Sequence, residues 1–268
     1  MSRPPALQRY WPKEAPEEGY RIYTQRPTRA LIWQPAEKWL DGAIASYGTV
    51  HAWAEQQGDR RDFVGRGRVF SVPAPVAGPD SADRWAVRHF HRGGALSMHM
   101  RDRYLRVGRR RPIRELAASV AARARGIKTP AVICAITYED GIYYRADLIT
   151  EVIPGAKTLA HTLLEHDGTL AWLIAMRQAG EVIQALTELG VHHVDLNAHN
   201  IVLTSGATPE AYVVDLDRAR ILRKPSLSAR DQMLARLTRS IVKIGTPTGE
   251  KLTESEILAA LDHPSTTR

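Results

Sequence analysis

Residues 193–200 read His-Val-Asp-Leu-Asn-Ala-His-Asn, and residues 213–217 read Val-Val-Asp-Leu-Asp. Asp195 and Asn200 lie five positions apart, and Asp215 follows 15 residues later, at the end of a short apolar run. A carboxylate can orient a hydroxyl and accept its proton, and carboxylate and amide oxygens are ligands that magnesium prefers. We therefore predict that Asp195 is a catalytic base and that Asn200 and Asp215 are metal ligands.

The spacing of these residues also predicts the fold. An Asp and an Asn five positions apart, with a second Asp opening the next segment, form the pattern of the protein-kinase catalytic loop, H-R-D-x-x-x-x-N. Phosphoryl transfer from ATP needs these groups, so ATP and Mg²⁺ are the expected cofactors. The alternative is that Asp195, Asn197 and Asn200 only form the hydrogen bonds of turns and caps. That alternative leaves Asp215 without a role.

The rest of the chain divides into a strand-rich part and a helix-rich part. Residues 1–30 contain five prolines and little periodicity, which predicts an irregular arm. Residues 31–153 predict a β-rich N-lobe with one main helix, and residues 154–268 predict a reduced, mostly helical C-lobe. The expected fold class is α+β, protein-kinase-like and two-lobed, with a hinge near residues 151–155.

Individual elements are predicted from hydrophobic periodicity. In the N-lobe we expect strands at 85–90, 131–138 and 142–153, and a helix from about Ile113 to Gly126. In the C-lobe, apolar residues recur every three or four positions up to Leu189, and Gly190 ends that helix. Short β-like runs follow at residues 201–203 and 212–214, and the last 40 residues return to helix.

Candidate nucleotide contacts precede the catalytic loop. The glycines of Gly65-Arg66-Gly67 would let backbone N–H groups approach phosphates, although two glycines are more often simply a turn. Arg88 stands where kinases usually have lysine, and Glu115, 27 residues later, is its expected ion-pair partner. Taken alone, Arg88 could equally be a surface residue. The predicted cofactor-binding residues are Gly65, Gly67, Arg88, Glu115, Glu151 and Ile153.

Composition narrows the class of protein. The 268 residues are 44% apolar, which excludes wholesale disorder, and the single cysteine, Cys134, excludes an internal disulfide. We expect Cys134 to be a buried core thiol. The net charge of +8 favours an anionic partner, which could be nucleic acid, a phosphorylated ligand or an acidic membrane surface. Apolar runs long enough to span a bilayer and the pattern of a signal peptide are missing from the sequence, so a cytoplasmic location is expected.

Within about residues 63–223 stand the stretches WAVRHFHRGG with RDRYL, YYRADLITEVIPGAKTL, GVHHVDLNAHNIVL and VVDLDRARI. They resemble the lipopolysaccharide core kinases, and among them those acting on 3-deoxy-D-manno-octulosonic acid (Kdo). The resemblance implies ATP-dependent phosphorylation of a sugar hydroxyl on Kdo-lipid IVA, by a peripheral protein at the cytoplasmic face of the bacterial inner membrane. It also implies that Asp195 is the base, that Asn200 and Asp215 bind metal, and that Arg88 and Glu115 form a phosphate clamp.

The sequence departs from the protein kinases after the metal-binding Asp. Leu216 and Asp217 replace the Phe and Gly of the D-F-G motif, and no A-P-E segment follows in the sequence. Only 53 residues lie beyond Asp215, which leaves little room for the peptide-binding helices of a protein kinase. A sugar or lipid-linked acceptor therefore fits better than a protein.

A basic stretch precedes the N-lobe helix and has two interpretations. Arginines near a membrane attract anionic lipid by about 1 kcal/mol each, which would suit an inner-membrane surface. The alternative is a solvated basic face. The stretch comprises Arg101, Arg103, Arg106, Arg109, Arg110, Arg111 and Arg114.

Three other functions are alternatives to a Kdo kinase. The chain could phosphorylate another acceptor, such as the core heptose or a small molecule. It could be a non-catalytic kinase-like regulatory module, although such a module would be expected to lose a base or a metal ligand. Nucleic-acid binding is suggested by charge alone, without the usual motif spacings, and no nucleic-acid partner is expected.

Overall fold

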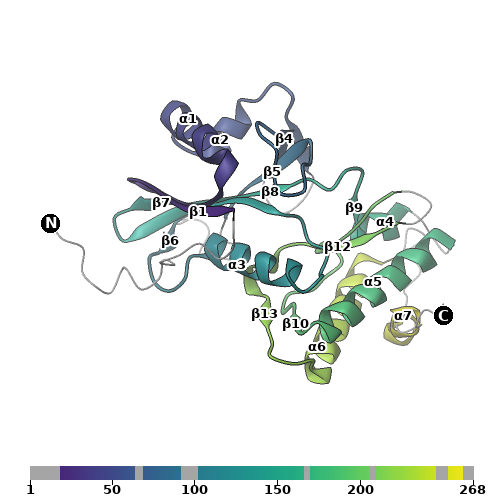
Figure 1. The fold of residues 1–268 in the computed structure, drawn as a ribbon. Helices are drawn as coiled ribbons and strands as arrows, with labels where there is room; N and C mark the ends of the chain where they lie inside the picture. The colour runs from purple at the N-terminus through teal and green to yellow at the C-terminus, as the bar shows by residue number, and fades with distance from the viewer. Residues whose placement is uncertain are drawn as a thin grey trace. The chain divides into compact units, whose positions relative to one another are not determined.

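The computed structural model describes residues 19–63, 69–91, 102–165, 170–205, 209–245 and 253–261. The chain forms two compact units (Figure 1). Unit 1 comprises Met1–Val120 and Ala131–Val152, and unit 2 comprises Ala121–Pro130 and Ile153–Arg268. In the part of the chain that the structure describes, no helix has both the length and the apolar character needed to cross a membrane.

Unit 1 is built on one antiparallel sheet in the order β1-β2-β7-β8-β5-β4-β3, with β6 paired to β8. The central β7–β8 hairpin turns at Gly141, whose φ of 57° suits a residue without a side chain. The strands are β1 (Tyr20–Gln25), β2 (Thr28–Trp33), β3 (Arg61–Phe63), β4 (Val69–Pro73), β5 (Arg84–His89), β6 (Tyr104–Leu105), β7 (Val132–Asp140) and β8 (Tyr143–Glu151).

Both faces of this sheet are covered by helices, which explains the apolar runs in its central strands. Successive strand residues point to opposite faces, so Ile149 joins one core cluster and Leu148 the other. The first cluster packs under α1 (Glu37–Tyr47) and α2 (Val50–Glu55), and the second under α3 (Arg111–Arg123). Figure 1 shows α1 and α2 on one side of the sheet and α3 on the other.

The structure confirms the predicted strand at 85–90, the hairpin and the helix after Ile113 as β5, β7–β8 and α3. Cys134 is buried, as expected.

Two predictions for unit 1 were wrong. Residues 20–30, assigned to an irregular arm, form β1 and the start of β2; residues 1–18 lie outside the described part. The expectation of one main helix missed α1 and α2. The helices are short, Gly48 lies between them, and α1 buries only Leu40 and Ala43, so the hydrophobic periodicity is weak.

Unit 2 is mostly helical, with short strand pairs between the helices. The helices are α4 (Leu159–Glu165), α5 (Leu170–Glu188), α6 (Leu227–Ile244) and α7 (Glu254–Leu261). The strands are β9 (Lys157–Thr158), β10 (Val191–His192), β11 (Ile201–Leu203), β12 (Ala211–Val213) and β13 (Arg220–Ile221). The predicted C-lobe helices and both β-like runs are confirmed.

Two local features fix the packing of unit 2. A Cβ on Gly180 of α5 would lie 2.0 Å from the carbonyl oxygen of Leu261, so glycine allows α7 to approach closely. The segment 121–130, which was expected in the N-lobe, belongs to unit 2. The Val213 N–H donates to the Lys128 carbonyl at 2.9 Å, and Lys128 forms an ion pair with Glu210 at 2.6 Å.

Candidate active site

The predicted catalytic loop, residues 193–200, connects β10 to β11 in unit 2. β10 pairs with β13, and β11 pairs with β12, so both ends of the loop are anchored in antiparallel ladders. Leu196 and Ala198 are fully buried within the loop. Asp195, the predicted base, lies between these anchors with a quarter of its side chain exposed.

The β11–β12 register brings the two predicted metal ligands to one end of the ladder. Ile201 pairs with Val213, so Asn200 and Val214 are the next opposed positions, and the Val214 N–H donates to the Asn200 carbonyl at 3.0 Å. Asp215 follows directly. Residues 15 positions apart in sequence are thereby neighbours in space.

Side-chain amides shape the loop around Asp195. Asn197 Nδ2 donates to the Asp195 carbonyl at 2.8 Å, and Asn200 Nδ2 donates to the same oxygen at 3.1 Å. Asn197 Oδ1 accepts from the His199 N–H at 2.9 Å. The turn-forming alternative therefore describes Asn197 well. Asn200 differs because its amide nitrogen is engaged, while its Oδ1 accepts no hydrogen bond from the residues that the structure describes.

Asp215 has an unusual backbone conformation. Its φ of 62° and ψ of 58° lie in the left-handed region, which costs a non-glycine residue about 1–2 kcal/mol. Strained residues of this kind occur preferentially at functional sites. The next residue, Leu216, is buried and begins a short 3-10 helix, Leu216–Arg218, that fixes the position of Asp215.

His193 stabilises the loop through contacts of its ring and its backbone. Its Nε2 lies 3.1 Å from the Val214 carbonyl, which can only accept, so Nε2 carries the proton. Burial lowers the pKa of His193 and keeps the ring neutral. Its backbone N–H donates to Sδ of Met233 on α6 at 3.4 Å. This side chain is structural and links the catalytic loop to the segment that carries Asp215.

Two arginines that sequence reasoning missed bind the carboxylate of Asp195. Arg218 Nη1 donates to Oδ2 at 2.7 Å, and Arg236 Nη2 lies 2.8 Å from Oδ1. A signal for Arg236 exists in α6, where Met233, Arg236 and Ser240 follow helical spacing. Met233 and Ser240 both contact the loop, so a polar residue between them was a candidate to reach it.

The donor set fits magnesium. Asn200 Oδ1 and the Asp215 carboxylate are hard oxygen ligands, and the hydrogen bond from Asn200 Nδ2 leaves Oδ1 for a cation. Magnesium is commonly held by one or two protein oxygens together with substrate phosphates. Among the residues that the structure describes, no group of three or more His, Cys, Asp or Glu side chains forms a metal cluster.

Among the predicted nucleotide contacts of unit 1, Arg88 and Glu115 come together. Arg88 Nη2 donates to Glu115 Oε2, so β5 and α3 are joined by the expected ion pair. The Glu115 side chain is buried, and the Arg88 guanidinium lies 4.7 Å from the centre of the Phe90 ring. Gly65 and Gly67 lie outside the described residues. A phosphate-binding role for this group stays a prediction.

Glu151 and Ile153 lie at the chain boundary between the units. The buried Glu151 carboxylate accepts from the backbone N–H groups of Asp80, at 3.0 Å, and Ala82, at 3.2 Å. A Cβ on Gly78 would lie 2.3 Å from Glu151 Oε1, so this glycine makes room for the carboxylate, whose pKa burial raises. The half-buried Ile153 accepts from the Ala156 N–H at 3.4 Å. Their nucleotide contacts stay predictions.

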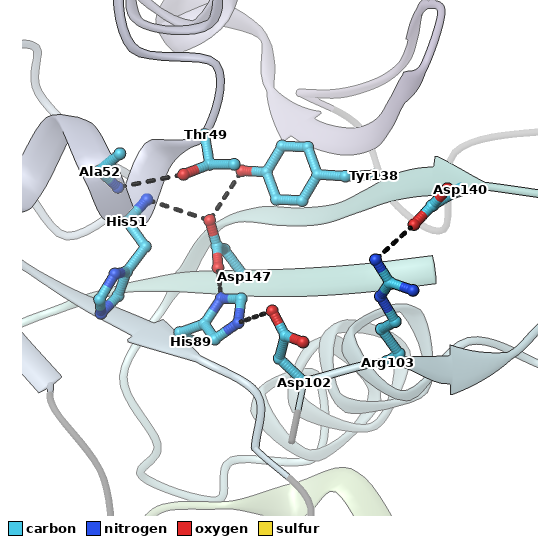
Figure 2. A network of polar contacts seen from close by, with 9 residues as sticks. All are labelled: Thr49, His51, Ala52, His89, Asp102, Arg103, Tyr138, Asp140 and Asp147. Carbon is cyan, nitrogen blue, oxygen red and sulfur yellow. Dashed lines mark hydrogen bonds and ion pairs between the residues drawn. The ribbon is translucent and has the colours of Figure 1, made fainter. Parts of the chain in front are cut away.

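A second carboxylate, Asp147 of β8, lies at the centre of a polar network in unit 1 (Figure 2). Its Oδ1 is 2.5 Å from His89 Nδ1, and its Oδ2 accepts from Tyr138 Oη at 2.7 Å. The same Oδ2 accepts from the backbone N–H of His51, in the first turn of α2, at 3.0 Å. His89 Nε2 faces Asp102 Oδ2 at 3.5 Å. No motif or spacing in the sequence singles out this network.

Comparison with known proteins places these features in context. Residues 50–259 match the lipopolysaccharide kinase (Kdo/WaaP) family. A protein of Xylella fastidiosa (strain M23) named 3-deoxy-D-manno-octulosonic acid kinase is 32% identical over 197 residues, which cover 73% of this chain and 74% of the relative. A protein of the same name from Xanthomonas oryzae pv. oryzae (strain PXO99A) is 33% identical over 218 residues, 79% of this chain and 80% of the relative.

A solved structure described as WaaP in complex with acyl carrier protein has the same fold. It superposes with a TM-score of 0.50 and 16% identity, covering 90% of this chain and 88% of that one. The likeness confirms the predicted α+β, protein-kinase-like fold.

Proposed function

Since the chain belongs to the lipopolysaccharide kinase (Kdo/WaaP) family, we propose that it transfers the γ-phosphate of ATP to a hydroxyl of the Kdo sugar on Kdo-lipid IVA. The observation that carries this proposal is the grouping of Asp195, Asn200 and Asp215 around the loop and ladder of unit 2. The names of the relatives support the sugar acid as the acceptor.

The roles of the residues follow from their chemistry. Asp195 orients the acceptor hydroxyl and takes its proton as the hydroxyl oxygen bonds to the γ-phosphorus. The bond from that phosphorus to the β–γ bridging oxygen breaks, and ADP leaves with the electron pair. Asn200 Oδ1 and Asp215 would hold Mg²⁺, which neutralises charge on the ATP phosphates when bound. Arg88, positioned by Glu115, would contact phosphate oxygens.

The proposed location is the anionic surface of the inner membrane, and the residues around β6 support it. Leu105, Val107 and Ile142 are exposed apolar side chains, and the Arg106 N–H donates to the Ile142 carbonyl at 2.9 Å, which joins the two segments. Apolar side chains among exposed basic residues are typical of membrane-surface contacts.

The basic stretch itself contributes less than its composition suggests. Arg106 forms an ion pair with Glu139 at 3.0 Å, and Arg110 is buried 4.9 Å from the Tyr144 ring centre. Burial lowers the pKa of Arg110. Arg103 and Arg109 are exposed and would face lipid, while Arg101 lies outside the described residues.

Sedimentation with lipid vesicles tests the location. We expect binding to vesicles that contain an anionic lipid and weaker binding to neutral vesicles. Val107→Ser should reduce binding, while Leu227→Ser, at an equally exposed site in unit 2, should not. Equal binding by both variants would contradict this surface.

The function itself is tested by offering labelled ATP and Mg²⁺ with purified Kdo-lipid IVA, heptosylated core or a generic protein. Label on Kdo-lipid IVA would support the proposal. Label only on another acceptor would refute the Kdo assignment. ATP binding without transfer to any acceptor would favour the regulatory module.

A further inference from the structure

The two arginines on Asp195 occupy both oxygens of the catalytic carboxylate. Arg218 takes Oδ2 and Arg236 takes Oδ1, at 2.7 and 2.8 Å. A base must offer one oxygen to the acceptor hydroxyl at hydrogen-bond distance. Because each oxygen already carries a guanidinium, moving one arginine away from Asp195 would open the carboxylate to the acceptor hydroxyl.

Both arginines are placed so that they can leave Asp195 for another anion. Their side chains are 58% and 46% exposed, and each comes from a different element, the 3-10 helix after Asp215 and α6. Exposed ion pairs of long side chains are weak because solvent screens them and holding them costs side-chain entropy. A structural arginine of the same chain, Arg106, is instead 12% exposed and also donates to the Gly141 carbonyl.

The two arginines beside Asp195 predict which kind of chemical group on the acceptor would bind them. Two guanidinium groups face the carboxylate of Asp195, one on each oxygen, beside the proposed position of the acceptor hydroxyl. A guanidinium binds a carboxylate or phosphate through two parallel hydrogen bonds. An anionic group on the acceptor would give at least one of these arginines a new partner.

We propose that Arg218 and Arg236 bind the carboxylate of the sugar-acid acceptor, and that this exchange releases Asp195 to act as the base. The inference rests on the proposed function, because it takes the sugar acid as the acceptor. It adds a specificity determinant: an acceptor without the anion would leave Asp195 paired with its arginines.

Other oxyanions offer the same chemistry, namely the γ-phosphate of ATP and the phosphates of the lipid part of the acceptor. The experiment separates these sources. The variants are Arg218→Gln and Arg236→Gln. Their controls are Arg223→Gln and Arg239→Gln, which remove the same charge at exposed positions nearby in the chain.

Each enzyme is assayed with the acid acceptor, with its carboxylate methyl ester and with a dephosphorylated lipid acceptor, and KM for ATP is measured alongside. We expect wild type to prefer acid over ester by about 10- to 100-fold in kcat/KM, the range for hydrogen bonds to charged groups. The preference should fall towards one in both variants, mainly through KM for the acceptor. The controls should keep the wild-type preference, and KM for ATP should stay within about twofold.

Three results would overturn the inference: equal losses on acid and ester, a raised KM for ATP with the acid preference intact, or a loss that disappears when the lipid phosphates are removed. If the wild-type enzyme transfers phosphate to none of the Kdo acceptors, the proposed function is refuted instead. Equilibrium binding of free Kdo without ATP then decides the arginine site. Binding that is lost in Arg236→Gln supports it, and no binding by wild type overturns it.

Discussion

Asp147 in unit 1 and Asp195 in unit 2 are both carboxylates bound by two basic or ionisable side chains, yet their surroundings differ. Asp147 is fully buried, and its partners are a histidine, a tyrosine and a backbone N–H held by secondary structure. Asp195 is a quarter exposed, and its partners are two long arginines in solvent. A carboxylate whose partners are held in place by the fold stabilises the fold. A carboxylate whose partners are mobile side chains can exchange them for a substrate.

The position of Asp147 explains its structural role. Thr49 Oγ1 accepts from the Ala52 N–H at 3.1 Å, and Tyr138 Oη accepts from the Val50 N–H at 2.9 Å. With the bond from His51 to Asp147, three N–H groups of the first turn of α2 have partners, and Figure 2 shows those of His51 and Ala52. These groups otherwise lack partners within a helix, and the helix dipole favours a negative charge there. Asp147 thus fastens α2 to the sheet.

The largest effect should come from Asp215→Asn, which removes a proposed metal ligand near Asp195. We expect phosphoryl transfer at saturating Mg²⁺ to fall about 1,000-fold, about 4 kcal/mol of transition-state stabilisation. Because Asn tolerates the left-handed conformation, the free energy of unfolding should change by less than about 1 kcal/mol. Initial rates and denaturant unfolding measure both, with Asp231→Asn as an exposed control. Full activity would remove Asp215 from the site.

Asp147→Asn should act on the fold instead. Removing the charge from a fully buried pair costs about 3 kcal/mol, and the amide is also a poorer acceptor for the α2 N-terminus. Denaturant unfolding should show this loss through a lower midpoint at unchanged slope. A loss below about 0.5 kcal/mol, the range of ordinary surface substitutions, would mean that Asp147 is not structural.

Tyr138→Phe sharpens the comparison with a smaller change. The phenol links the Val50 N–H to Asp147, so its removal leaves one buried donor without its partner and costs about 1–2 kcal/mol. Tyr143→Phe, on β8 and partly exposed, is the control and should be nearly neutral. Thermal unfolding at one pH compares the two. Equal shifts in Tm would argue against the network.

The pH dependence of stability gives the smallest effect. Burial alone would lower the pKa of His89, but the hydrogen bond and charge of Asp147, together with Asp102, outweigh it and raise the pKa. His91 nearby has a lowered pKa, through burial and the charge of His89. A raised pKa in the folded state stabilises the protein below the unfolded value of about 6.5.

That stabilisation is lost as pH rises through the folded pKa of His89. The unfolding free energies of wild type and His89→Gln should therefore converge as pH rises above about 6.5 and through the higher folded pKa, where His89 loses its charge. Urea unfolding across this range measures the difference. A difference that grows with pH would contradict the sign of the shift.

The parts of the site that the sequence predicted are those set by local spacing. Asp195 and Asn200 share one loop, and Asp215 lies two residues after β12, whose antiparallel partner β11 begins beside Asn200. The Arg88–Glu115 pair was also predicted, because kinase order fixes which strand and helix carry it. Each of these contacts follows from a motif or from a register.

The missed features depend on contacts between distant segments. Arg236 lies 41 positions after Asp195, and its contact follows from how α6 packs on the loop. Asp147 lies within a largely apolar run of the sequence, and only the folded sheet shows that it faces α2. Residues 20–30 were assigned to an irregular arm because of the prolines in residues 1–30, although they contain a short strand with an alternating pattern.

The most direct test of the contrast is the phosphoryl-transfer rate of Asp195→Asn and Asp147→Asn, each divided by its folded fraction measured under the same conditions. Asp195→Asn should be folded like wild type but slower by about 1,000-fold or more, as expected when a catalytic base and its charge are lost. Asp147→Asn should be less stable but have nearly the wild-type rate per folded molecule. Wild-type rates from Asp195→Asn, or a comparable loss from folded Asp147→Asn, would contradict this contrast.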